Sequence, residues 1–292
     1  MRMMAILMAL ATVTGCSGSA ERSPEKQSGA RLVSSHVSKA PTVDGKGDDA
    51  IWQSAAPLEL VVRRVWPPDV TKVARVWLRT VHTGTHVYVL AVWEDETKDD
   101  ESHKSWVWDA AKNAYVEGTD REDMFSLAFE LSGVWNPDML SGEEAVWDVW
   151  QWKATRTNPQ GYAMDRTHRY TREKPQGKAK EYPTHRGSTI WIGRPEDAGD
   201  TVEKKQAAPK EKQEDRVSQY LPGTPTGSAA DVRAKGTWAD GKWTLEFERE
   251  LDTGHADDTA FRCGRAYSMA VGTHDRTGDM DKASGTITLR LE

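Results

Sequence analysis

The side chains that could carry chemistry in this sequence are methionine, histidine and tryptophan. Met139 lies beside a turn in Asn-Pro-Asp-Met-Leu-Ser-Gly, and its thioether is a soft, neutral metal ligand. Downstream, aromatic residues alternate with polar ones in Asp148-Val-Trp-Gln-Trp-Lys, before a loop rich in Asn, Pro and Gly. The 13 tryptophans suit a core, a flat ligand pocket or an interface equally well, so Trp147, Trp150 and Trp152 could flank a ligand or fill the interior.

Motifs of the common enzyme classes are absent from the sequence. It contains no HExxH, no glycine-rich phosphate loop and no nucleophile elbow, and its carboxylates show no spacing that singles out an acid–base pair. The histidines beyond residue 40 lack metal-ligand spacing, which favours structural or surface roles. They are His82, His86, His103, His168, His185, His255 and His274. We therefore expect no intrinsic catalytic activity.

Length and charge narrow the class of protein. The chain has 292 residues, 37% of them hydrophobic, which is enough for one large core or two small ones. The net charge of −6 argues against nucleic acid, which requires a basic face.

The N-terminus has the plan of an export signal. Residues 1–16 combine a positive charge, a short apolar run and small residues before Cys16. Val-Thr-Gly-Cys resembles the bacterial lipobox, whose cysteine is lipidated, although an ordinary signal peptide containing a cysteine is the alternative. Residues 17–39 are polar and predict a flexible linker, so lipid on Cys16 would tether an exported protein to the bacterial membrane, facing the periplasm or cell surface.

One cysteine, Cys263, remains after Cys16. It cannot form an internal disulfide, and no CxxCH is present for covalent haem attachment. We expect Cys263 to be a small buried hydrophobe.

Residues 40–292 predict an all-β domain. Residues 73–81 and 86–93 flank a short glycine turn, and residues 232–238 and 242–248 flank an Asp-Gly pair, the usual signals of hairpins. With no convincing long amphipathic helix, short strands favour an antiparallel β-sandwich. Polar residues 166–187 and 196–219 predict long surface insertions, the second partly disordered.

Several segments together resemble a known family. Pro-Thr-Val-Asp-Gly-Lys-Gly-Asp-Asp-Ala-Ile-Trp52 is similar to the opening of family 9 carbohydrate-binding modules and of ethylbenzene dehydrogenase haem-binding subunits. Asp148-Val-Trp-Gln-Trp-Lys-Ala, with Arg156-Thr-Asn-Pro-Gln-Gly-Tyr, resembles the haem-binding branch. So does the closing Asp281-Lys-Ala-Ser-Gly. This branch is the cytochrome c-552/DMSO reductase-like haem-binding domain family, whose haem is b-type and not covalently attached.

The resemblance implies two axial ligands to a haem iron, a methionine and a distant lysine. They correspond to Met139 before Leu-Ser-Gly and Lys282 before Ala-Ser-Gly, where family members often have a Lys-Ser-Val-Ser-like run. Other methionines lie near these motifs, and His168 or His274 is a possible substitute ligand. The methionines are Met124, Met164 and Met280. A lysine must lose its proton to coordinate, so we expect the Asp281 carboxylate to face away from Lys282 or to have its own partner.

Two protein ligands leave no open position on iron, which implies electron transfer. The expected function is therefore that of an exported, lipid-anchored b-type haem protein. It would exchange electrons with a redox partner such as a molybdenum oxidoreductase or a respiratory-chain component. The alternatives are a carbohydrate-binding sandwich without haem, using exposed Trp faces to stack on sugar rings, and a structural lipoprotein whose site has decayed.

Overall fold

The computed structural model describes residues 29–65, 68–277 and 281–292, and its regular structure is dominated by β-strands. The helices in the described residues are short 3-10 turns: Ala50–Ser54, Asn158–Gln160 and Gly227–Ala230. None of the described helices is long and apolar enough to cross a membrane.

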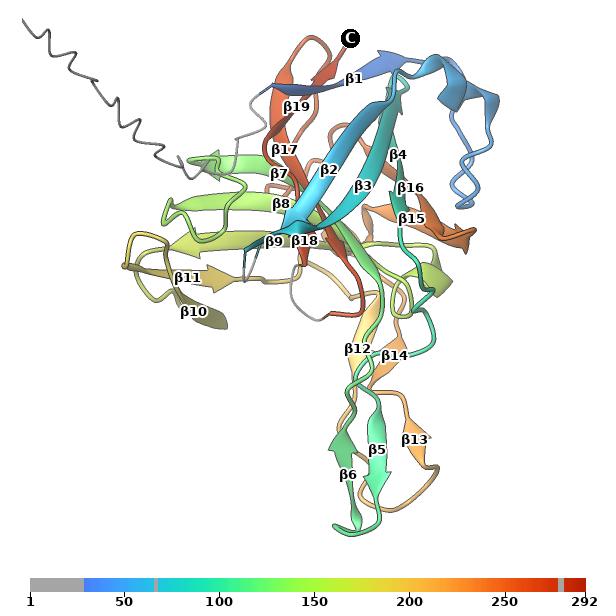
Figure 1. Cartoon of the computed structure of the whole chain (residues 1–292). Coiled ribbons are helices and arrows are strands. Elements are labelled where there is room, and N and C mark those ends of the chain that lie inside the picture. The colour runs from blue at the N-terminus through green and yellow to red at the C-terminus, as the bar shows by residue number, and fades with distance from the viewer. Residues whose placement is uncertain (1–28, 66–67, 278–280) are drawn as a thin grey trace, which may run out of the picture.

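A 14-stranded sheet forms the body of the molecule (Figure 1). Its path begins with five strands that pair antiparallel: β10 (Ala179–Pro183), β11 (Thr189–Gly193), β9 (Met164–Thr171), β8 (Ala145–Lys153) and β7 (Met124–Gly133). The path continues through β17 (Ala266–His274), β18 (Lys282–Ala283), β2 (Leu58–Arg64), β3 (Asp69–His82), β4 (His86–Glu94), β16 (Lys242–Glu250) and β15 (Arg233–Ala239). Two further strands, β1 (Ala30–His36) and β19 (Ile287–Leu291), pair with each other and with β3 and β17 respectively.

The two halves of this sheet pack face to face around an aromatic core. Trp93 of β4 stacks on Phe125 of β7 with ring centroids 4.8 Å apart. Trp152 of β8 meets Trp243 of β16 edge-on at 4.9 Å. All four side chains are buried, so the predicted antiparallel β-sandwich is confirmed.

The predicted hairpins are present. Strands β15 and β16 pair from Arg233–Glu248 to Ala239–Lys242, and the two turn residues Asp240 and Gly241 have φ angles of 51° and 74°. Positive φ at both central positions is what a tight hairpin turn needs, and Asp-Gly tolerates it.

An arm projects from the sandwich (Figure 1). It contains a three-stranded sheet and a two-stranded sheet. The strands are β5 (Trp106–Asp109), β6 (Ala114–Glu117), β13 (Arg216–Val217), β12 (Glu203–Lys205) and β14 (Tyr220–Pro222). Within the segment expected to be partly disordered, 196–219, residues 203–205 pair with β14 and residues 216–217 pair with β5.

The predicted flexible linker, 17–39, is wrong at its C-terminal end. Residues 30–36 form β1, which pairs parallel with β19. Leu32 and Ser34 alternate inward and are buried, a period-two pattern that the polar residues around them obscured. The domain therefore begins before residue 40. The predicted signal peptide 1–16 and Cys16 lie outside the described residues.

Two other expectations need correction. The segment predicted as a surface insertion from residue 166 begins instead within β9, an interior strand of the sheet, whose polar side chains Arg166 and His168 line a large, partly open cavity. Cys263 is exposed, with its Sγ 3.5 Å from Nε2 of His82, because it lies in a turn between the buried Phe261 and β17.

Candidate functional site

One face of strand β8 packs in the sandwich core, and the other face lines a cavity. Alternate side chains face opposite sides of a strand, and here one side is the sandwich core. Trp150 and Trp152 belong to that core. The intervening residues line a large cavity on the opposite face: Trp147, Val149, Gln151 and Lys153. Of the three tryptophans considered in the sequence, only Trp147 is therefore placed to contact a ligand in this cavity.

The cavity has a volume of about 1380 Å³. Small-molecule sites commonly measure about 300–1,000 Å³, so there is room for a large ligand. Part of the wall is apolar: Trp147 lines it and packs in a tilted arrangement against Tyr170, with ring centroids 4.3 Å apart. Basic side chains also line it: Arg64, Arg121, Arg166, Arg194, Lys180 and Lys204. This composition suits a ligand with an apolar body and acidic groups.

Met139 lines the cavity from the loop between β7 and β8. Two interactions hold the loop. The Leu140 N–H donates to Oδ1 of Asp138 at 2.9 Å, and the His185 N–H donates to the carbonyl of Leu140 at 3.1 Å. Met139 packs, half-buried, against the apolar cluster that contains Trp147. The structure thus places this predicted ligand at a ligand-sized space.

Lys282 lies beside the cavity, but its side chain does not line it. Its neighbours Asp281 and Ala283 both do. Its Nζ lies 2.5 Å from Oδ2 of Asp281 and 3.9 Å from Oδ2 of Asp275. Asp281 does not face away from Lys282, but it has a partner of its own, as the alternative expectation stated: Nε of Arg64 lies 3.6 Å from its Oδ1. The structure thus places Met139 on the cavity wall and Lys282 between two residues of that wall.

A buried ionic network forms another part of the cavity wall. Lys153 Nζ lies 2.8 Å from Oε1 of Glu203 and 3.4 Å from Sδ of Met164. Arg156 pairs with the same Glu203 oxygen at 3.0 Å and with Glu122. Burial lowers the pKa of Lys153 to about 7, although Glu203 opposes that shift. A buried amine that can lose its proton near neutral pH therefore faces the cavity.

His168 and His274 also line the cavity. Burial, reinforced by the positive charge of Arg194, holds the pKa of His168 well below its ordinary value. Its imidazole is therefore neutral, the form that binds metals. Nδ1 of His168 lies 3.4 Å from the Tyr170 hydroxyl.

Comparison with known proteins assigns the family. The family model described as ethylbenzene dehydrogenase matches residues 49–284, most of the chain. The chain belongs to the ethylbenzene dehydrogenase family. No curated protein gives a significant sequence match.

Solved structures similar to this ethylbenzene dehydrogenase family member share about a tenth of its sequence. Two are of a family 9 carbohydrate-binding module from Caldicellulosiruptor kristjanssonii, in complex with glucose and with cellotriose. The glucose complex is 10% identical, with a TM-score of 0.38, and the match covers 90% of this chain and 95% of that one. The cellotriose complex is 9% identical, with a TM-score of 0.37 and coverage of 90% and 93%. A putative carbohydrate-binding protein from Bacteroides uniformis ATCC 8492 is 9% identical, with a TM-score of 0.41 and coverage of 90% and 99%.

Asn158, in the Arg156–Tyr162 motif of the family resemblance, has a structural role. Oδ1 of Asn158 accepts hydrogen bonds from Nε1 of Trp152 at 3.1 Å and from the Gly236 N–H at 2.8 Å. Its Nδ2 donates to the Gly236 carbonyl at 3.0 Å. Asn158 thus joins β8 to β15 and has no contact with the cavity.

Sequence reasoning missed Lys153 and Arg166 as cavity residues. Both occupy positions on strands whose register brings Val149 opposite Arg166 and Met124 opposite Lys153. The available signal was the placement of polar residues at alternate positions, Gln151 and Lys153 in β8 and Arg166 and His168 in β9. Such a pattern indicates a polar face, but it does not distinguish solvent from a cavity.

Proposed function

We propose that the cavity binds haem b and that the protein transfers electrons. The observation that carries the proposal is the position of Met139 on the wall of a cavity of about 1380 Å³ in an ethylbenzene dehydrogenase family member. A thioether is a soft, neutral iron ligand and favours a raised haem potential.

The residues of the cavity fit such a group. Trp147, Val149 and Ile192 offer apolar surface for a flat macrocycle. The basic side chains around the cavity offer partners for its carboxylates, and an Arg–carboxylate pair is the strongest of these. Haem held by two protein ligands supplies reversible one-electron transfer. The protein's own part is to exclude water, balance charge and fix the two ligands.

Met139 and Lys282 are the proposed ligands. Lys282 must then leave the Asp281 carboxylate and coordinate as a neutral amine, because an ammonium has no lone pair to offer. His168 needs neither step, because its buried imidazole is already neutral and lines the cavity. Variants of Lys282 and His168 therefore distinguish the sequence-based ligand from its structural competitor.

The proposed setting is an exported protein anchored through lipid on Cys16. Its partner would be a redox protein, such as a molybdenum oxidoreductase or a respiratory-chain component. This setting follows from the N-terminal sequence and the family, and metabolic labelling with a fatty acid tests the anchor. Labelling should be lost in Cys16→Ala.

A carbohydrate-binding role would need exposed aromatic faces. Among the described residues, the large hydrophobic side chains that are exposed are Val70, Val73, Val134 and Leu221, and none of them is aromatic. Haem reconstitution and a polysaccharide affinity column test the two functions side by side. Stoichiometric haem uptake with no retention on the column supports the proposal, and the opposite pair of results contradicts it.

A further inference from the structure

A group of buried carboxylates lies on the core side of β8 and β9, away from the cavity. Asp148, Asp165 and Asp258 each place one carboxylate oxygen within 4.8 Å of the others. Their relative exposures are 0%, 1% and 6%. The residues come from β8, β9 and the loop after β16, so three separate segments converge on one point.

The hydrogen bonds to Asp148 are confined to one of its oxygens. Oδ2 accepts from Nη1 of Arg249 at 2.6 Å and from the Thr259 N–H at 2.9 Å. Oδ1 is buried and accepts no hydrogen bond. Arg249 therefore neutralises one side of the carboxylate and leaves the other side available.

Asp165 is the member of the group whose carboxylate oxygens both lack a hydrogen-bond partner. Both of its carboxylate oxygens are buried, and neither accepts a hydrogen bond. Its polar side-chain contact is with another carboxyl group, that of Asp197, whose Oδ2 also accepts none. A buried carboxylate without partners is strongly unfavourable, so the group must be protonated or lie beside a positive species.

The charges within the group do not balance. Asp148, Asp165 and Asp258 all act on the guanidinium of Arg249, and Asp197 lies beside Asp165. The cluster must therefore hold protons, or a cation must replace them.

We propose that Asp148, Asp165 and Asp258 bind a divalent cation of the calcium class, with Asp197 beside it. All the available donors are carboxylate oxygens, which select hard cations over zinc or copper. Calcium accepts several carboxylates in an irregular, dehydrated cage, whereas magnesium retains most of its water. Such an ion would fasten β8, β9 and the loop after β16 from the side opposite the cavity.

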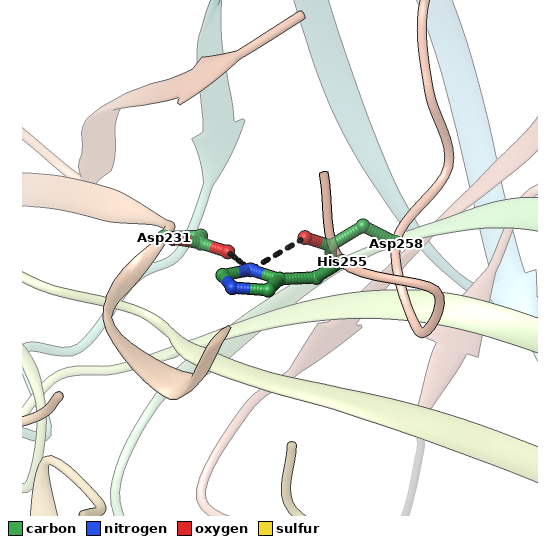
Figure 2. A group of neighbouring side chains, drawn as sticks. All are labelled: Asp231, His255 and Asp258. Carbon is green, nitrogen blue, oxygen red and sulfur yellow. Dashed lines mark hydrogen bonds and ion pairs between the residues drawn. The ribbon is translucent and has the colours of Figure 1, made fainter. Parts of the chain in front are cut away.

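Asp258 connects this cluster to the surface. Figure 2 shows His255 between Asp231 and Asp258, with Nδ1 at 2.6 Å from Oδ2 of Asp231 and 4.0 Å from Oδ2 of Asp258. A hollow of about 290 Å³, lined by Asp231 and Arg249 among others, opens beside this group. The hollow carries the carboxylates of Asp231, Glu248 and Glu250 together with Arg233 and Arg249, and it gives solvent access on the side of the cluster where Arg249 lies.

Calcium binding to the full chain, stripped with EGTA, tests the proposal by calorimetry and thermal unfolding. We expect one equivalent of calcium and an increase in the unfolding midpoint of roughly 5 °C at a hundredfold excess over Kd. Asp165→Asn should abolish both effects. Glu246→Gln should preserve them, because the buried Glu246 carboxylate already accepts from Trp52 Nε1 at 2.8 Å and from the Gly45 N–H at 2.8 Å.

Terbium luminescence provides a readout that does not depend on the variant folding. Trp150 is the register partner of Asp165, so terbium bound there should show tryptophan-sensitised emission that calcium displaces. No calcium uptake and no sensitised emission in the wild type would overturn the proposal. So would a folded Asp165→Asn variant that still binds one equivalent.

Discussion

Nζ of Lys282 lies 2.5 Å from Oδ2 of Asp281, the residue immediately before it. This ion pair keeps the lysine amine occupied, while Asp281 and Ala283 on either side of it line the cavity. If Lys282 binds haem iron, the Asp281 carboxylate competes with the iron for it. The relationship between these two residues therefore makes the choice of the second ligand testable.

Asp281→Asn should strengthen haem binding, because the neutral amide competes less for the lysine amine. Lys282→Gln should lose the low-spin spectrum, whereas His168→Gln should retain it. Haem titration followed by visible absorption checks all three variants. A spectrum that survives Lys282→Gln and disappears in His168→Gln assigns the position to the histidine instead.

The buried amine of Lys153 predicts a pH dependence of stability. Its pKa falls from an ordinary 10.5 to about 7 on folding. Between those values the unfolded chain holds the proton and the folded chain does not, so stability rises with pH. The wild type should gain up to about 1.4 kcal/mol per pH unit across this window relative to Lys153→Met, and Lys153 should contribute no slope well below pH 7.

Urea unfolding at several pH values measures this difference. Lys112→Met is the matched control, because the Lys112 side chain is 66% exposed and pairs with Asp109 at 2.9 Å. Parallel pH profiles for the wild type and Lys153→Met would contradict the assigned shift.

The fold was more predictable from sequence than the site. Hairpins were visible because Asp240-Gly241 combines turn chemistry with flanking period-two strands. Strand β9 was missed because Arg166 and His168 face a cavity, and a polar residue facing a cavity looks the same in sequence as one facing water. The environment of Lys282 depends on Asp275 and Asp281 folding around it, and no local pattern encodes that.

Arg249→Leu should destabilise the protein by about 3–5 kcal/mol in EGTA, because it leaves the buried Asp148 carboxylate without its cationic partner. The two side chains are fully buried and 2.6 Å apart. Arg290→Leu, which removes a half-exposed pair with Glu292 at 3.5 Å, should cost about 1 kcal/mol or less. Chemical denaturation of both variants checks the contrast, and equal losses would show that Arg249 is not the key cation of this cluster.

Gly236→Ala should cost about 1–3 kcal/mol by overpacking. A Cβ atom at this position would lie 2.7 Å from Cζ2 of Trp152, a ring held by Trp93 and Trp243. Gly84→Ala is the control, because its Cβ would meet no atom within 4 Å. Thermal unfolding should show a loss for the first variant only, and an unchanged Gly236→Ala protein would mean that the core repacks freely.

The visible absorption spectrum of the purified chain, titrated with haemin, tests the central claim most directly. We predict stoichiometric uptake and a low-spin spectrum in the wild type. Met139→Leu should lose that spectrum and remain folded, because the exchange conserves volume. Met269→Leu, a core substitution, should keep it. No haem uptake by the wild type, or an unchanged low-spin spectrum in Met139→Leu, would contradict the account.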